Sequence, residues 1–326
     1  MTERPSLRGY AIALLGTGIW SASAVFISYL TTRFRMPPLV LAFWRDFLVT
    51  CTLAVALLLF ARRRLSLQRR HVPFFVLYGF LLAIFNSLWT VSVDLNGPSV
   101  ATVLIYISPA FTALIGWRWF DERLPAPKIA AIVLSLIGCV FASGANDPSA
   151  WQGNSRGILI GLGTGLAFTF YSLMGKASSS KGINPWKATL YTFAFGSGFL
   201  LLLQRPATLF WLSRPLTQGS AGWREAALGW TTIVLLAIGP TLGGYGIYTV
   251  SLTHLPTSTA NLILTLEPAM TAILAFAFLG ERLAPAQLAG GAVVLVGVFL
   301  LRLSERQAVS STASPASPPL SPKRRG

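Results

Sequence analysis

The feature that most constrains this chain is a series of apolar runs of roughly 20 residues each, joined by short polar segments. A helix rises about 1.5 Å per residue, so each run can cross the roughly 30 Å hydrocarbon core of a bilayer. Proline occurs at many of the joins, where the first turn of a helix tolerates it. The pattern predicts ten spans, near residues 9–30, 39–60, 73–93, 99–119, 127–144, 157–176, 185–203, 226–250, 257–279 and 285–302. We therefore expect an all-α integral membrane protein with the lipid bilayer as its solvent.

The composition agrees with this interpretation, because 53% of the residues are apolar and 11% are charged. The formal net charge of +16 is also found in nucleic-acid-binding proteins. Here, however, the basic residues form short clusters between apolar runs and no continuous polar face. The densest cluster, within residues 62–70, is interpreted as a solvated cytoplasmic loop. The sequence therefore argues against a nucleic-acid partner.

Cysteine and histidine give no sign of a metal site. Cys51 and Cys139 lie inside apolar runs, where a thiol behaves as a small hydrophobe, and neither has metal-ligand spacing to His71 or His254. The first run, residues 9–30, is too long for the apolar core of a signal peptide. We expect no metal or other cofactor, and we expect the first run to be a spanning helix.

The distribution of Lys and Arg predicts the orientation of the chain. Most of the 26 basic residues fall on the side of the N-terminus once the ten spans are counted off, and cytoplasmic loops carry such an excess. Both termini are therefore predicted to be cytoplasmic, in the inner (plasma) membrane of a bacterium. Residues 303–326 are rich in Ser, Pro and Ala and can bury little apolar surface, so this tail is expected to be disordered.

An internal repeat divides the spans into two halves. A shift of 159 residues aligns Ser99–Gly138 with Ser258–Gly297, and twelve of the forty positions are identical. Each half holds five predicted helices, and an odd number of crossings turns the second copy upside down relative to the first. The predicted organisation is a cytoplasmic N-terminus (1–8), a first repeat (9–144), a connecting loop (145–156), a second repeat (157–302) and the tail (303–326).

Inverted repeats favour a carrier. Two copies about an in-plane pseudo-two-fold axis can exchange conformations and open a midplane site to one side and then to the other. An enzyme would need catalytic groups such as His-Glu-x-x-His or paired intramembrane carboxylates, and a channel would need a filter motif; the sequence shows none of these. A duplication without functional meaning stays open as an alternative.

The repeated motifs also resemble a known family. Pro109 and the run Glu122-Arg-Leu, repeated as Glu267-Pro-Ala and Gly280-Glu-Arg-Leu-Ala-Pro, are similar to the EamA repeat of the drug/metabolite transporter superfamily. The resemblance covers nearly all of residues 9–302 and is strongest in the last two helices of each half. It implies a ten-helix exporter with a central cavity lined mostly by helices 1, 3, 4, 6, 8 and 9. Within the superfamily, the chain is most similar to bacterial aromatic amino-acid exporters.

Aromatic and polar residues recur on single faces of the inner spans. In helix 3, for example, Tyr78, Phe85 and Trp89 are offset by seven and four residues and share one face. Aromatic faces attract ammonium groups and hydroxyls orient polar ends, although packing or interfacial anchoring is an open alternative. The candidate cavity residues are Trp20, Tyr78, Phe85, Asn86, Trp89, Tyr106, Ser108, Tyr171, Thr241, Tyr245, Tyr248, Asn261 and Glu267.

Three charged residues fall well inside predicted spans, away from the span ends. Glu267 lies near the middle of helix 9, where a carboxylate can exchange protons, pair with a substrate amine, or serve the backbone freed by Pro268. Arg45 and Asp46 lie about a third of the way along helix 2. Neighbouring residues point about 100° apart on a helix, so they are not expected to form an ideal pair. A structural network is favoured for them, with substrate carboxylate binding as the alternative.

The sequence as a whole predicts an alternating-access carrier that exports small amphipathic metabolites. Amino acids with aromatic or other apolar side chains are the expected substrates, and cationic drugs or quaternary amines are the alternative. Glu267 is the candidate for coupling to protons. No obligate protein partner is indicated.

Overall fold

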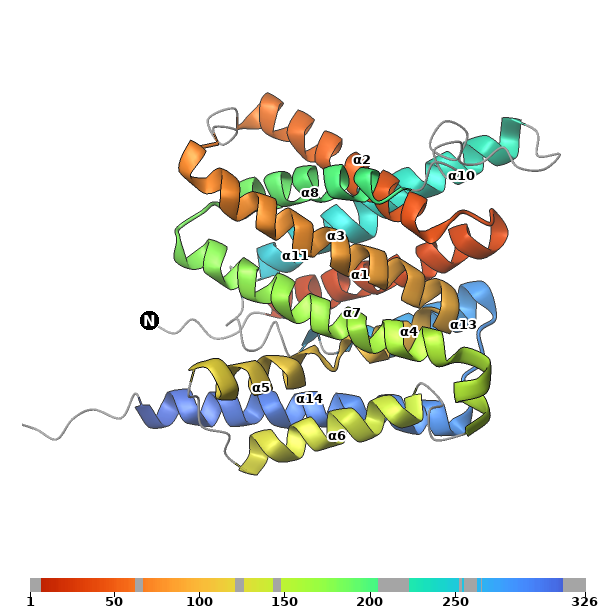
Figure 1. Cartoon of the computed structure of the whole chain (residues 1–326), viewed down its shortest axis with the longest axis vertical. Coiled ribbons are helices and arrows are strands. Elements are labelled where there is room, and N and C mark those ends of the chain that lie inside the picture. The colour runs from red at the N-terminus through yellow and green to blue at the C-terminus, as the bar shows by residue number, and fades with distance from the viewer. Residues whose placement is uncertain are drawn as a thin grey trace, which may run out of the picture.

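The computed structural model confirms the all-α fold class (Figure 1). It describes residues 7–61, 67–120, 126–142, 148–204, 223–251, 254, 263–264 and 266–312. Every regular element within these residues is helical. The elements are α1 (Leu7–Arg33), α2 (Pro38–Phe60), η2 (Arg69–His71), α3 (Val72–Asn96), α4 (Pro98–Ile105), α5 (Ser108–Phe120), α6 (Ala126–Ala142), α7 (Pro148–Ser180), α8 (Pro185–Leu202), α10 (Trp223–Leu236), η3 (Ala237–Gly243), α11 (Gly244–Ser251), α13 (Glu267–Leu279) and α14 (Pro285–Thr312).

Proline marks the first turn of several of these helices, as the sequence predicts. A proline occupies one of the first two positions of α2, α3, α4 and α8. At α8 the side chain of Asn184 also accepts hydrogen bonds from the backbone N–H groups of Trp186 and Lys187, at 3.1 and 3.4 Å. Such a cap supplies an acceptor to N–H groups that have none within the helix.

The order of the described elements fits the ten predicted spans. Among the described residues, five helices are long and apolar enough to cross a membrane: Leu7–Arg33, Pro38–Phe60, Arg69–Asn96, Gly153–Ser180 and Arg224–Ile247. In the described part of the chain, the fourth and eighth predicted spans are interrupted. The fourth contains α4 and α5, and the eighth contains α10, the π-helix η3 and α11.

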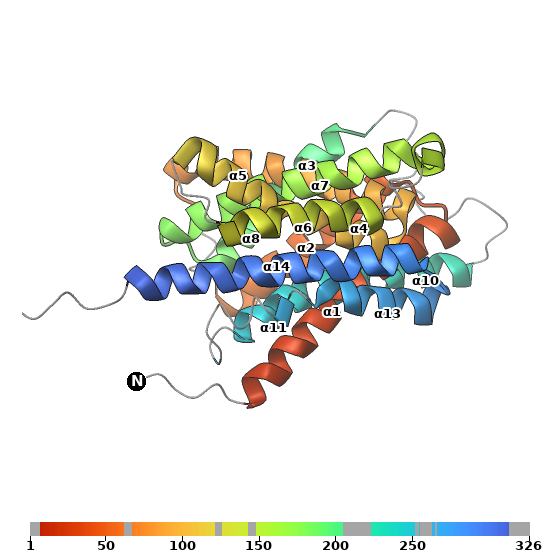
Figure 2. The ribbon, with the colours of Figure 1, turned by 90° about the horizontal axis from the view of Figure 1, so that it is seen from below.

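Equivalent helices of the two halves have equivalent neighbours. α1 packs against α11 and α13, while its counterpart α7 packs against α3 and α4. The counterparts α6 and α14 pack against each other, as do α2 and α8. In Figures 1 and 2, α6 and α14 lie side by side and run in opposite directions. The two halves are therefore inverted repeats related by a pseudo-two-fold axis.

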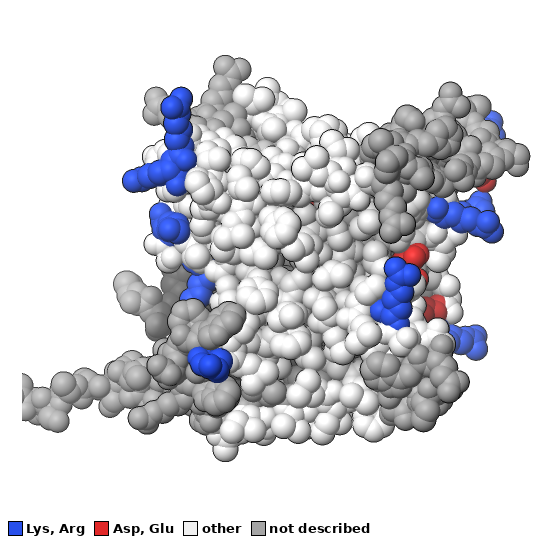
Figure 3. Space-filling view, in the orientation of Figure 1, with Lys and Arg blue, Asp and Glu red and all other residues white. Residues whose placement is uncertain are grey.

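The surface has the polarity of a membrane protein. α1 begins and α14 ends on the same side of the molecule, at the left in Figure 1. Figure 3 shows Lys and Arg at the left and right edges of the visible face, with a broad uncharged belt between them. Large apolar side chains such as Leu59, Ile273 and Phe276 are exposed. The hydrocarbon core of a bilayer is the solvent that matches such a surface.

The side opposite the start of α1 is closed by polar and apolar contacts. Arg33 at the end of α1 forms a 3.2 Å ion pair with Glu225 of α10. Glu281 accepts hydrogen bonds from the hydroxyl of Ser99 at 2.7 Å and from its backbone N–H at 3.4 Å. Burial raises the pKa of Glu281, because desolvation outweighs these bonds. An apolar cluster that includes Leu30 fills the same end of the bundle.

The C-terminal helix is longer than the sequence predicts. α14 continues to Thr312, so residues 303–312 are helical where a disordered tail was expected. Glu305, Arg306 and Gln307 are good helix formers, and they extend a helix that the membrane span has already nucleated. Residues 313–326 lie outside the described part of the chain.

The contact between α6 and α14 depends on glycine. A Cβ atom added at Gly290 would collide with the backbone N of Ala142 and lie 2.7 Å from the carbonyl O of Gly138. Backbone atoms cannot move aside as a flexible side chain can, so we expect Gly290→Ala to destabilise the protein by about 1–3 kcal/mol. Thermal unfolding in detergent measures this as a lowered Tm. Gly198→Ala in α8 is the matched control, because nothing lies within 4 Å of its added Cβ; equal Tm values for the two variants would contradict the prediction.

Candidate functional site

A cavity of about 500 Å³ lies within the helix bundle. Its wall draws on both repeats, from α1, α2, α3 and the α4–α5 break in the first half and from α7, α8, η3, α11 and α13 in the second. It reaches Arg45 and Glu267 inside the bundle, and it also reaches Ser179 at the end of α7 and Pro185 at the start of α8. The cavity thus extends toward the side on which α1 begins. On the opposite side lie the contacts of Arg33, Glu281 and the Leu30 cluster.

Aromatic rings form much of the wall. Tyr171 of α7 stacks on Phe85 of α3, with 5.7 Å between ring centroids and 19° between ring planes. The ring centroids of Tyr171 and Tyr78 are 5.2 Å apart, and those of Trp20 in α1 and Tyr245 in α11 are 6.5 Å apart. These contacts join helices of different repeats. The wall therefore offers flat apolar faces of the kind that hold apolar or cationic groups.

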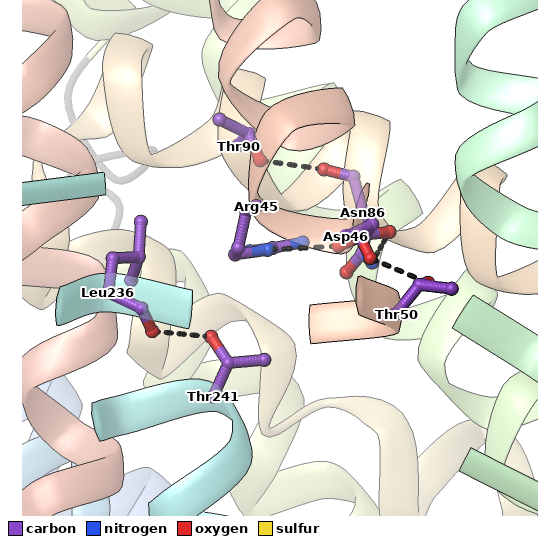
Figure 4. Close-up of polar contacts among 7 residues, drawn as sticks. All are labelled: Arg45, Asp46, Thr50, Asn86, Thr90, Leu236 and Thr241. Atoms are coloured by element: carbon purple, nitrogen blue, oxygen red, sulfur yellow. Dashed lines mark hydrogen bonds and ion pairs between the residues drawn. The ribbon is translucent and has the colours of Figure 1, made fainter. Parts of the chain in front are cut away.

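Helices that line the cavity are broken near it, and polar side chains satisfy the backbone at the breaks. Pro240 in η3 has no N–H, which leaves the carbonyl of Leu236 without its usual helical partner. The hydroxyl of Thr241 donates a 2.9 Å hydrogen bond to that carbonyl (Figure 4). Pro268 frees the carbonyl of Leu264 in the same way, and the Tyr106 hydroxyl lies 2.8 Å from it. Backbone polar groups at this depth need such partners because no bulk water is available.

Glu267 is the first residue of α13 and lines the cavity. Its Oε2 atom lies 3.0 Å from the Tyr106 hydroxyl. That hydroxyl has one proton for two acceptors, the carboxylate and the Leu264 carbonyl, so the carboxylate can accept further donors. The Leu264 carbonyl, which Pro268 leaves without a helical partner, is therefore bonded by Tyr106 and not by Glu267. The contact joins the α4–α5 break of the first repeat to α13 of the second.

Arg45 and Asp46 form a buried ion pair, which corrects the expectation that adjacent residues would not pair well. Arg45 Nε lies 3.1 Å from Asp46 Oδ1, and the two side chains are 4% and 0% exposed. The Arg side chain is long enough to fold back beside its neighbour. Asn86 of α3 donates a 2.6 Å hydrogen bond to Asp46 Oδ2, and Thr90 bonds to the Asn86 carbonyl (Figure 4).

The structure brings most of the predicted site residues together. The cavity wall contains Trp20, Tyr78, Phe85, Asn86, Trp89, Tyr106, Ser108, Tyr171, Thr241, Tyr245 and Glu267. The side chain of Tyr248 and the whole of Asn261 lie outside what the structure describes. Whether the residues of the wall bind a solute stays a prediction.

Other residues of the wall were missed from the sequence. The resemblance assigned the cavity mostly to helices 1, 3, 4, 6, 8 and 9, yet α2 contributes Arg45 and α8 contributes Thr192. Within the described residues, Ser178 and Thr192 also carry buried hydroxyls without a hydrogen-bond partner. Serine and threonine are common in these helices, so no pattern in the sequence distinguishes the two. The described residues contain no cluster of His, Cys, Asp or Glu that could hold a metal ion.

Comparison with known proteins gives consistent matches. The sequence matches the EamA-like transporter family over residues 7–144 and 155–303. It is 26% identical over 262 residues to the uncharacterized transporter YwfM of Bacillus subtilis, covering 80% of this chain and 83% of that protein. It is 29% identical over 221 residues to the threonine/homoserine exporter RhtA of Escherichia coli, covering 67% of each. A crystal structure matches 92% of the chain with a TM-score of 0.59 and 17% identity.

The Tyr106 hydroxyl is expected to contribute to stability. Tyr106→Phe keeps the ring and removes the group that serves the Leu264 carbonyl, which leaves that carbonyl short of a partner at a cost of about 1–3 kcal/mol. We expect a lowered Tm in detergent. Tyr10→Phe, at a ring that is 39% exposed on α1, is the control and should leave the Tm unchanged. A Tm for Tyr106→Phe equal to that of the control would refute the assignment.

Proposed function

The chain belongs to the EamA-like transporter family and is a membrane transporter, and from this premise we propose that it exports small amphipathic metabolites, chiefly amino acids, by alternating access. The observation that carries the proposal is the cavity. It lies between two inverted repeats, and its wall combines aromatic rings with charged groups. A volume of about 500 Å³ is ample for an amino acid.

The geometry supports a mechanism in which the repeats move against each other. The cavity extends toward the side that holds the start of α1, and this side has the excess of Lys and Arg along the sequence. We assign that side to the cytoplasm of a bacterium, with the cavity between loading positions for cytoplasmic solute. Export then requires the contacts of Arg33 and Glu281 on the far side to open.

The choice of amino acids rests on chemistry and on similarity. RhtA, named as a threonine/homoserine exporter, shares 29% identity with this chain. Cationic drugs are the second candidate, and the aromatic wall with Glu267 favours them. Arg45 weighs against them, because it is the one cation among the described residues that line the cavity.

Counterflow in proteoliposomes tests the proposal. Vesicles loaded with an unlabelled solute should accumulate the same solute in radiolabelled form when they contain the protein. We expect saturable accumulation with members of an amino-acid panel that includes phenylalanine and threonine, and little with quaternary amines. Protein-free liposomes are the control. Flux that rises linearly with concentration, without counterflow, would contradict a carrier.

Glu267 is proposed to exchange a substrate ammonium group for a proton. A carboxylate that binds both in turn makes exchange depend on pH, because protons compete with the substrate for the same oxygen atoms. We expect Glu267→Gln to abolish the pH dependence of counterflow, since the amide does not titrate. Asp94→Asn, at an exposed residue near the end of α3, should retain that dependence. An unchanged pH profile in Glu267→Gln would rule out this role.

A further inference from the structure

The cavity wall, as far as the structure describes it, carries one cation and one carboxylate. Arg45 comes from α2 in the first repeat and Glu267 from α13 in the second. The two are not paired with each other, because Arg45 pairs with Asp46 and Glu267 lies against Tyr106. Opposite charges held apart in a site of low dielectric cost solvation free energy unless a ligand or water meets them. The two separated charges therefore indicate a ligand that carries a negative group for Arg45 and a positive group for Glu267.

The guanidinium of Arg45 is bonded through its Nε atom, and Arg45 is one of the residues that line the cavity. Its Nε atom bonds to Asp46, while its two terminal nitrogens have no hydrogen-bond partner among the described residues. Asp46 is fully buried and does not line the cavity, and its second oxygen accepts from Asn86. Asp46 and Asn86 are thus positioning residues. The two terminal nitrogens have the fork geometry that binds a carboxylate with two parallel bonds.

Glu267 is also incompletely satisfied. Its Oε2 atom shares the Tyr106 proton with a backbone carbonyl, and its Oε1 atom has no hydrogen-bond partner among the described residues. An ammonium group has three donors and matches these acceptors. Elsewhere in the wall, the buried hydroxyls of Ser178 and Thr192 also have no partner in the part of the chain that the structure describes. Buried polar atoms are normally paired, so these two independently indicate a polar ligand or ordered water in the cavity.

We propose that the cavity recognises zwitterionic α-amino acids, with Arg45 binding the substrate carboxylate, Glu267 binding the ammonium group and the Phe85–Tyr171 wall holding the side chain. This inference rests on the proposed function and narrows its substrate class. Amines that lack the carboxylate leave the Arg45 fork unpaired and place their charge near another cation. Acids that lack the ammonium group leave Glu267 unpaired. Each loss of a buried charged partner disfavours the ligand.

Competition in counterflow tests the assignment with four matched probes. Phenylalanine has both charges, its methyl ester and 2-phenylethylamine lack the carboxylate, and 3-phenylpropionate lacks the ammonium group. In the natural protein, we expect phenylalanine to compete about 100-fold better than each of the other three, which corresponds to losing one buried charge contact. Equal competition by all four would overturn the inference.

Substitutions then assign each charge to its residue. Arg45→Gln should weaken competition by phenylalanine but not competition by its methyl ester. The ratio of the two competition strengths should therefore fall to about one. Because Arg45→Gln leaves the Asp46 charge buried alone and can impair folding, the double variant Arg45→Gln/Asp46→Asn removes both charges and serves as the second test. Glu267→Gln should remove the preference for phenylalanine over 3-phenylpropionate. It should keep the preference for phenylalanine over its methyl ester. The Tm of each variant reports its folding independently.

The outcomes separate this inference from the proposed function. If no amino acid or amine shows counterflow with the natural protein, the proposed function fails. If amino acids are carried and the folded double variant keeps the natural preference for phenylalanine over its ester, the role of Arg45 is wrong while the carrier stands. Loss of the preference in that variant, with the ester still carried, supports the assignment.

Discussion

The structure depends on a constraint that the membrane imposes on the backbone. Within the hydrocarbon core, each N–H and C=O group needs a partner from the protein, because bulk water is absent. Pro240 and Pro268 each free a carbonyl in the middle of the bundle. The hydroxyls of Thr241 and Tyr106 donate hydrogen bonds to these carbonyls, and both residues line the cavity. The breaks that interrupt the helices therefore also bring polar groups to the site.

The same constraint organises the charges. Asp46 is tolerated in the interior because Arg45 and Asn86 satisfy both its oxygens. Within the described residues, that arrangement leaves the terminal nitrogens of Arg45 without a hydrogen-bond partner, and Arg45 and Glu267 line the cavity from opposite repeats. A solute that contacts both charges spans the interface between the repeats. Its binding then depends on their relative position, and this dependence is what an alternating-access carrier needs in order to link occupancy to conformation.

Much of the fold could be predicted because a helix that spans lipid needs a long apolar run, which is visible in the sequence. The apolar runs locate the helices, the prolines locate their starts, and the repeat between Ser99–Gly138 and Ser258–Gly297 reveals two halves of opposite orientation. Aromatic periodicity also found most of the aromatic residues that line the cavity. It did not select Arg45, for which the sequence favoured a structural network, and it missed Ser178 and Thr192, because hydroxyls occur throughout these spans.

The sequence by itself determined the number, order and inverted symmetry of the helices, since these follow from hydrophobic length and from the parity of crossings. Only the tertiary structure decided which polar groups meet. The pairing of Arg45 with Asp46, the approach of Asn86 and the contact of Tyr106 with both Glu267 and the Leu264 carbonyl join residues whose side-chain directions depend on helix rotation and packing. Hydropathy fixes that a helix spans the membrane, whereas the neighbours packed around it fix the direction in which each face points.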